Sequence, residues 1–351
     1  IWLLKQLWVE KNGKNFLKII ITKVIIFGLR LSMNNKIKFQ IYKNLLKIRL
    51  IENKIAQEYP NQKMRCPVHL SIGQEAIAAP LDQLFEKKDI VVSGHRAHSH
   101  YLGKGGDIKK FIDELHGKKS GFSRGKAGSM HLYDKDNGFY GSSPIVANII
   151  PVGVGIALSN KLKKNNKTVI IFFGDGATEE GVFYESLNFA AIHNLRIIFV
   201  CENNLYSVYS NLNFRQAKNR NISDVAKSLK VNAIKANGNN IDSTIKAFVS
   251  AKSYFVKKKK PILIEFETYR FIEHCGPYDD DHLNYRKKNE VNKWKKKDPL
   301  DILFKNLSKS QKNSLKKYSS DLTKKINKLF LESRSAKFPK QSIAFEGLYE
   351  K

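Results

Sequence analysis

Asp175 and Asn204 are the residues of this chain best suited to hold a divalent cation. Asp175 lies between two glycines directly after the apolar run TVIIFF (168–173), and Asn204 closely follows the run RIIFVC (196–201). Short, β-branched, uniformly apolar runs are typical of strands buried on both faces of a parallel sheet, and such strands end on one common edge. That edge would bring together a carboxylate and an amide oxygen, which with a nearby backbone carbonyl suit Mg²⁺ shared with two phosphates.

The glycines beside Asp175 favour the same interpretation, because they let the backbone approach a diphosphate, and free amides at the start of the next helix favour its charge. Two alternatives stay open. Gly-Asp-Gly is also a common tight turn. Gly174 and Gly176 could instead begin a GxGxxG nucleotide loop, but Glu179 stands where the third glycine should lie, and Asp175 would face a pyrophosphate without a metal.

Histidines form a second group of candidates. His95, His98 and His100 lie within HRAHSH, which could be a metal cluster of the form H-x-x-H-x-H. Glycine-rich flanks and the lack of an evident carboxylate partner favour instead a loop that reaches a phosphate. His274 follows YRFIE in a long polar stretch and would by itself be a surface histidine. A free imidazole titrates near neutrality, which would fit proton transfer by His98 and His274.

The order of apolar runs and helical patterns around these residues predicts an α/β fold with a doubly wound, mostly parallel sheet. The helical pattern FYESLNFAAIH connects the first two apolar runs, and STIKAFVSAKSYF connects VNAIKA (231–236) with ILIEF (262–266). Amphipathic stretches at 41–55 and 315–329 predict further helices. The polar stretch 270–300 is too long for an ordinary connection, which indicates a functional or mobile segment.

Composition excludes some classes of protein. The 351 residues carry 62 Lys and Arg against 32 Asp and Glu, a formal net charge of +30, and only three Cys. Three cysteines cannot hold together a secreted disulfide scaffold or make paired four-ligand zinc clusters, so we expect a reduced, cytoplasmic protein. The charge leaves a basic nucleic-acid- or membrane-surface-binding protein as an alternative. It is spread along the chain without interleaved aromatic residues, which favours a solvated surface.

The first segment, 1–32, contains an apolar stretch that Lys18, Lys23 and Arg30 interrupt, whereas a membrane span needs about 20 predominantly apolar residues. We expect Met33 to be the natural start and 1–32 to be non-native upstream sequence, with a basic surface helix as the alternative. The expected organisation is then an N-terminal helical region (33–92) packed on the main domain, and an α/β domain with C-terminal helices (93–351).

Several motifs in order carry a family resemblance. They are HRAHSHYLGKGGD, GKAGSMHLYD, GSSPIVANIIPVGVGIAL, GDGATEEGVFYESLNFAA and CENNLYSVYS. The Gly-Asp-Gly tripeptide followed after a helix by Asn203-Asn204 resembles the signature of thiamine diphosphate enzymes. From about Met33 onward, the chain resembles the α subunit of the decarboxylating component of 2-oxo acid dehydrogenase complexes of the pyruvate, branched-chain and acetoin types. The resemblance implies the phosphate-binding half of the thiamine diphosphate-binding fold.

The resemblance implies roles at the phosphate end of the cofactor. Asp175, Asn204 and the Tyr206 carbonyl would ligate Mg²⁺, and the backbone amides of Gly176 and Ala177 would face the diphosphate of thiamine diphosphate.

Other matching positions would surround the rest of the cofactor. Arg96 would clamp the diphosphate as a bidentate donor, and His95 stands where relatives often have a tyrosine that contacts it. Ile145 and Val146 would form a wedge under the bent cofactor, although ordinary core packing is an alternative for this pair.

His98 and His274 match family positions that line the substrate pocket, where they would handle protons and help present the acceptor; His274 would also contact the cofactor. Cys275 stands where mitochondrial pyruvate-type relatives have a regulatory serine, so phosphorylation is not expected there. The Tyr285-Arg286 pair is family-like, and an unusual run of acids, Asp279–Asp281, precedes it.

The resemblance finally implies a reaction and partners. A pyruvate-like 2-oxo acid would lose CO₂, and its acyl fragment would pass to the lipoyl group of a partner acyltransferase. The glutamate that activates the cofactor would come from a separate β subunit in an α₂β₂ assembly, so the isolated chain would be inactive. An acetoin- or sugar-pathway thiamine enzyme that cleaves a carbon–carbon bond is the alternative within this class.

Overall fold

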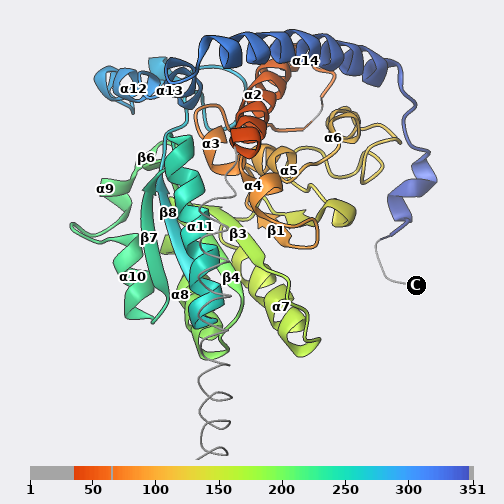
Figure 1. The fold of residues 1–351 in the computed structure, drawn as a ribbon. Coiled ribbons are helices and arrows are strands. Elements are labelled where there is room, and N and C mark those ends of the chain that lie inside the picture. Colours follow the sequence, from red (N-terminus) through yellow and green to blue (C-terminus); the bar gives the residue numbers. More distant parts are fainter. Residues whose placement is uncertain (1–34, 65, 348–351) are drawn as a thin grey trace, which may run out of the picture.

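A six-stranded parallel sheet forms the centre of the molecule in a computed structural model, which describes residues 35–64 and 66–347 (Figure 1). The expectations for residues 1–32 and for Met33 as the start lie outside the described residues. The strand order is β2-β1-β3-β4-β8-β7, and all five neighbouring pairs are parallel. The strands are β1 (Ile90–Ser93), β2 (Phe139–Ser142), β3 (Val169–Gly174), β4 (Ile197–Asn203), β7 (Asn232–Asn237) and β8 (Ile262–Glu267).

The apolar runs become strands because both faces of the sheet are covered. Alternate side chains of β3 point to opposite faces: Ile170 and Phe172 join one core cluster, whereas Ile171 and Phe173 join the other. Every residue of β4 is buried. The predicted α/β fold with a mostly parallel sheet is therefore confirmed.

Two sets of helices cover the faces (Figure 1). One face packs against α7 (Ile149–Leu162), α8 (Gly181–Ile192) and α10 (Ile222–Ser228). The other packs against α2 (Asn35–Glu58), α3 (Glu75–Ala78), α4 (Leu81–Leu84), α5 (His98–Gly103), α6 (Ile108–Leu115) and α11 (Ile241–Lys258). The helices predicted between the strand pairs and at 41–55 correspond to α8, α11 and α2.

The C-terminal helices lie beyond this second layer (Figure 1). They are α12 (Lys288–Lys295), α13 (Pro299–Lys305) and the long α14 (Lys309–Ser335), which packs against α2 and includes the helix predicted at 315–329. None of the helices that the structure describes combines the length and the apolar composition of a bilayer-crossing segment.

The short strands β1 and β2 were not predicted from the sequence. Each has four residues and lies within or beside the Gly- and His-rich region, where no long apolar run marks a strand. β1 nevertheless pairs with β3 and β2, so the central sheet crosses the domain boundary expected after residue 92. That boundary stays a prediction.

Candidate active site at the carboxyl edge of the sheet

A pocket opens where β1, β3 and β4 end. Every residue that the sequence predicts for the site lines this pocket, except His98. The lining includes Gln74, Ser93, His95, Arg96, His100, Ile145, Val146, Asp175, Gly176, Ala177, Glu202, Asn204, Tyr206 and His274. The pocket thus brings together side chains from segments about 200 residues apart in the sequence.

The register between β3 and β4 positions Asp175 and Asn204 in the pocket. Gly174 at the end of β3 pairs with Glu202 in β4, so Asp175 and Asn204 both follow directly from paired strand ends. Asp175 is buried, and its carboxylate forms an ion pair with Arg215. Burial raises the pKa of the Asp175 carboxyl, and the guanidinium opposes that rise. A buried anion of this kind requires a cation beside it.

Asn204 and Tyr206 face the same pocket from a tight loop after β4. The Asn204 Oδ1 atom accepts a hydrogen bond from the Tyr206 amide at 3.1 Å, and its Nδ2 atom donates to Gln74 Oε1 at 3.0 Å. Leu205 and Val208 have φ values of +71° and +52°, a strained conformation for side chains of their size. The loop is therefore held in one shape, which fixes the Tyr206 backbone.

This oxygen-rich set fits a magnesium ion with a diphosphate. A buried carboxylate and an amide oxygen are hard donors, and neither thiolate nor imidazole is part of the set. Gly176 lies so close to the opposite loop that a Cβ atom there would be 2.9 Å from Ser207 Oγ. A bare backbone at this point suits close approach of a phosphate.

Arg96 supplies an unneutralised positive charge to the pocket. It is buried, and its guanidinium donates to the carbonyls of Leu70 at 2.6 Å and His274 at 3.0 Å. Among the described residues it forms no ion pair with a carboxylate, and burial lowers its pKa to about 10. A buried cation with only neutral partners is prepared to bind an anionic ligand.

His95 and His274 meet a third histidine, His69, which was not predicted. Ring centroids lie 4.7 Å apart for His69 and His95, 5.1 Å for His69 and His274, and 5.3 Å for His95 and His274. Burial, together with the Arg96 charge, lowers their pKa values to about 2 for His69, about 4 for His95 and about 3 for His274. All three are therefore neutral at pH 7, and each ring can donate one hydrogen bond and accept another.

The nearby histidines in HRAHSH do not act as one group. His98 is fully buried outside the pocket lining, between Glu52 Oε1 at 3.0 Å and Ser129 Oγ at 2.7 Å. The expectation that these histidines lack carboxylate partners is wrong for both His98 and its neighbour His100.

His100, which was named only as part of a possible metal cluster, lines the pocket instead. It stacks on Phe172 at 3.9 Å and lies between Ser93 Oγ at 2.7 Å and Glu202 Oε1 at 3.1 Å. Residue type could not separate the two histidines, because only the orientation of the short helix α5 decides which side each one faces.

Ile145 and Val146 are the exposed apolar members of the pocket wall. They are 65% and 48% exposed although they line the pocket. Ordinary core packing, the alternative for this pair, is therefore excluded.

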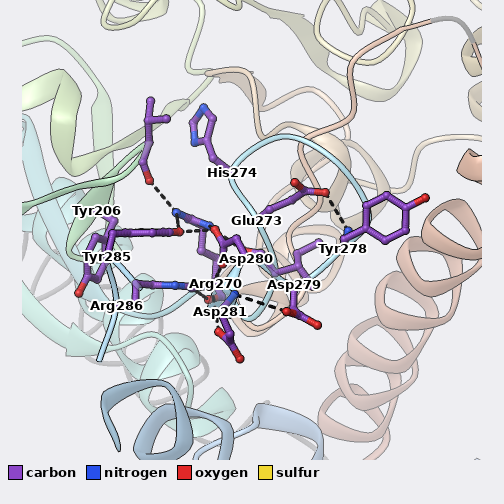
Figure 2. Close-up of polar contacts among 12 residues, drawn as sticks. Tyr206, Arg270, Glu273, His274, Tyr278, Asp279, Asp280, Asp281, Tyr285 and Arg286 are labelled. Atoms are coloured by element: carbon purple, nitrogen blue, oxygen red, sulfur yellow. Dashed lines mark hydrogen bonds and ion pairs between the residues drawn. The ribbon is translucent and has the colours of Figure 1, made fainter. Parts of the chain in front are cut away.

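A network of buried charges fixes the loop that carries His274 (Figure 2). Arg270 donates to Val208 O at 2.7 Å and Tyr285 OH at 2.6 Å, and it forms an ion pair with Asp280 at 3.3 Å. Asp280 also accepts hydrogen bonds from Tyr285 and Arg286. Burial alone would raise the pKa of Asp280, but these donors lower it below its ordinary value.

Gln74 and His69 show what sequence reasoning missed. Both precede or begin α3, about a hundred residues before the Gly-Asp-Gly tripeptide, and no spacing relates them to it. Their nearest signal is the glycine between them, Gly73, whose φ of +101° and close approach to the Tyr269 carbonyl allow this segment to pass beside the pocket.

Comparison with known proteins identifies the family. Residues 43–342 match the model described as dehydrogenase E1 component. Three relatives bear the name pyruvate dehydrogenase E1 component subunit alpha. One from Rickettsia bellii is 34% identical over 259 residues, which are 74% of this chain and 78% of the relative. The mitochondrial protein of Solanum tuberosum is 31% identical (88% and 79% covered), and that of Saccharomyces cerevisiae is 32% identical (89% and 74% covered).

These matches confirm the predicted resemblance to the α subunit of a thiamine diphosphate-dependent 2-oxo acid dehydrogenase. The motifs quoted from the sequence lie within the matched range. The chain belongs to the dehydrogenase E1 component family.

Proposed function

We propose that the chain is the α subunit of a pyruvate-type dehydrogenase, acting on a small 2-oxo acid and passing the acyl fragment to a lipoyl group. The observation that supports this most is the shared pocket of Asp175 and Asn204, with the unneutralised Arg96 in the same lining. Bound thiamine diphosphate would supply the nucleophilic carbon and the electron sink for decarboxylation. The protein would supply binding, orientation and proton transfer.

Two sets of residues would hold the cofactor. Asp175, Asn204 and the Tyr206 carbonyl would bind Mg²⁺, and the amides of Gly176 and Ala177 would face the diphosphate. Fixed donors that are already oriented need no reorganisation when the ligand arrives, which strengthens binding.

Four more residues complete this cofactor site. Arg96 would pair with the diphosphate, and His95 would contact it. Ile145 and Val146 would support the ring system, since these apolar side chains stand exposed at the pocket wall.

His274 would handle protons in the neutral form. Its pKa of about 3 means that it is uncharged at neutral pH, so that it can accept or donate a hydrogen bond at a reacting group. His98 would act through its neighbours, because Glu52 and Ser129 occupy both of its ring nitrogens. We therefore propose His98 as a residue that positions the pocket wall.

A β subunit would complete the site in an α₂β₂ assembly. Ile145 and Val146 are exposed at the pocket wall, and the nearby helices α7 and α8 carry further exposed apolar side chains. These are Val152, Leu162, Tyr184, Phe189 and Ile192. An exposed apolar surface of this kind is typical of an interface. The activating glutamate would come from that subunit, and Glu202 of this chain is already engaged by His100.

The remaining partner would be a lipoyl acyltransferase in the cytoplasm. The three cysteines of the chain are all unpaired, which agrees with a reducing compartment.

Calorimetric titration tests the proposal. The chain assembled with its β subunit should bind thiamine diphosphate only with Mg²⁺, and Asp175→Ala should weaken that binding at least about 100-fold, equal to about 2.7 kcal/mol. Asp224→Ala is the matched control, because Asp224 is an exposed acid on α10 that forms an ion pair with Lys227. Polyanion binding indifferent to Asp175→Ala, with no cofactor binding, would overturn the proposal.

A panel of substrates tests the finer assignment. We expect reductive acylation of a lipoylated acceptor with pyruvate to exceed that with branched-chain 2-oxo acids. Cleavage of acetoin without a lipoyl acceptor would instead favour the alternative within this class.

A further inference from the structure

The guanidinium of Arg215 is already paired with the carboxylate of Asp175, which the metal would need. Arg215, the last residue of α9 (Leu212–Arg215), donates from Nη2 to Asp175 Oδ2 and from Nη1 to Glu179 Oε1. Its Nε atom donates to the Ser210 carbonyl at 3.0 Å. The side chain is only 11% exposed, and that of Asp175 is 1% exposed. All three nitrogens of the guanidinium group are thus engaged beside the proposed metal ligand Asp175.

The loop that carries Arg215 also carries the proposed metal carbonyl. β5 (Tyr206–Ser207) pairs with β6 (Ser210–Asn211), and Asn211 caps α9 by accepting from the Asn213 amide at 2.9 Å. The Leu212 amide donates to the Leu205 carbonyl at 2.7 Å. Tyr206 and Arg215 are therefore parts of one small hydrogen-bonded unit.

The guanidinium also lies beside the expected phosphate position. A Cβ atom built on Gly176 would be 3.6 Å from Arg215 Nη1, and Gly176 is the residue whose amide would face the diphosphate. A divalent metal and a guanidinium compete for the same carboxylate. The two cations repel each other, so each is attracted more strongly to the carboxylate when the other has moved away. A diphosphate beside them would attract whichever cation has lost its partner.

We propose that Arg215 is a further residue of the metal–diphosphate site. It neutralises Asp175 in the metal-free chain, and it turns its freed Nη2 edge to the diphosphate when a metal takes over that carboxylate. Glu179 keeps the guanidinium in place during this exchange. This inference rests on the proposed cofactor site and adds a residue to it.

Arg220 provides the matched control. It comes from the same segment and holds the same turn, η3 (Asp175–Glu179), by donating to the Thr178 carbonyl at 2.7 Å and to Tyr184 OH at 2.9 Å. It forms no ion pair with a carboxylate in the described part of the chain. Arg220→Gln therefore removes the same charge and a similar clamp without touching Asp175.

The test compares Arg215→Gln, Arg215→Lys and Arg220→Gln in the full chain assembled with its β subunit. Titration calorimetry measures binding of Mg²⁺ alone, and of inorganic diphosphate and thiamine diphosphate at saturating Mg²⁺. Arg215→Gln should bind Mg²⁺ alone several-fold more tightly, because the competing cation is gone. It should bind both diphosphates about tenfold or more weakly. Arg215→Lys should restore part of the diphosphate affinity, and Arg220→Gln should stay within about twofold of the wild type.

Opposite shifts for the metal and the diphosphate are the result that a purely structural role cannot produce. If Arg215→Gln leaves both affinities unchanged, or lowers both together, the inference is wrong while the proposed function stands. If the wild type binds no thiamine diphosphate with Mg²⁺, the proposed function fails and the inference fails with it. Thermal unfolding of each variant identifies a loss of fold.

Discussion

At the carboxyl edge of the sheet, Asp175 and Asn204 are placed by backbone hydrogen bonds between β3 and β4, whereas His274 in the same pocket is placed by side chains. Strand pairing uses backbone amide and carbonyl groups, which do not depend on the type of side chain. The loop at 270–286 is fixed instead by two buried arginines that share the carboxylate of Asp280 (Figure 2).

This difference predicts how each region responds to change. The strand edge should tolerate substitution of neighbouring side chains, because its geometry belongs to the backbone. The loop should depend on a single carboxylate, because two guanidinium groups without it would repel each other in a buried site. The regions touch where Arg270 donates to the Val208 carbonyl, two residues after Tyr206.

The largest effect is expected for Asp280→Ala. Removing the shared anion leaves Arg270 and Arg286 buried and unpaired, which should lower the free energy of unfolding by about 3–5 kcal/mol. Urea denaturation measures this change. Loss of the His274 position should also reduce turnover more than it reduces affinity for the Mg²⁺-bound cofactor.

Asp279→Ala is the control for that prediction, since Asp279 is the exposed neighbour in the same acidic run. It should change stability by no more than about 0.5 kcal/mol. Equal effects of the two substitutions would show that the loop does not depend on the buried carboxylate.

Lowering the pH should reduce the free energy of unfolding through His69, by a smaller amount than Asp280→Ala does. His69 has a pKa of about 2 in the folded chain and an ordinary value of about 6.5 when unfolded, so between these values only the unfolded chain takes up its proton. Its contribution to stability is therefore complete above about pH 6.5 and falls as the pH decreases. Between pH 7.5 and 5.5 it should lose about 1.4 kcal/mol.

His69→Gln isolates this contribution, because the variant has no imidazole to protonate in either state. The groups that face His69 include His95, His274 and Arg96, and the positive charge of Arg96 opposes its protonation further. Urea denaturation at both pH values should give a shallower pH dependence for the variant than for the wild type. Identical slopes would contradict the prediction.

The smallest effect is expected at the strand edge, for Gly176→Ala. The new methyl group would press on Ser207, whose hydroxyl can rotate away, so the loss should be about fivefold in cofactor affinity, equal to about 1 kcal/mol. Gly181→Ala is the matched control, because a Cβ atom there meets nothing within 4 Å. A loss of cofactor-binding free energy as large as the loss of unfolding free energy expected for Asp280→Ala would mean that the strand edge, too, depends on side-chain fit.

Much of the fold was predictable because its signals are local. The runs that became β3, β4 and β8 are mostly apolar, and the rule that parallel strands end together places Asp175 near Asn204. β1 and β2 gave no such signal, since they are short, and their register is set by pairing of β1 with β3 and of β2 with β1.

The pocket wall was less predictable, because burial separates residues that look identical in sequence. His98 and His100 are two positions apart, yet only His100 lines the pocket. Asp279 and Asp280 are adjacent, yet only Asp280 is buried between two arginines.

The order of apolar runs and glycines along the chain by itself determined the parallel sheet, the edge on which ligands bind and the chemistry of the metal ligands. Only the tertiary structure decided which histidines face the pocket, that His69 joins them, and that Arg215 pairs with Asp175. The physical reason is that strand pairing repeats a backbone pattern written in consecutive residues. Desolvation and charge pairing depend instead on neighbours brought together from distant parts of the chain.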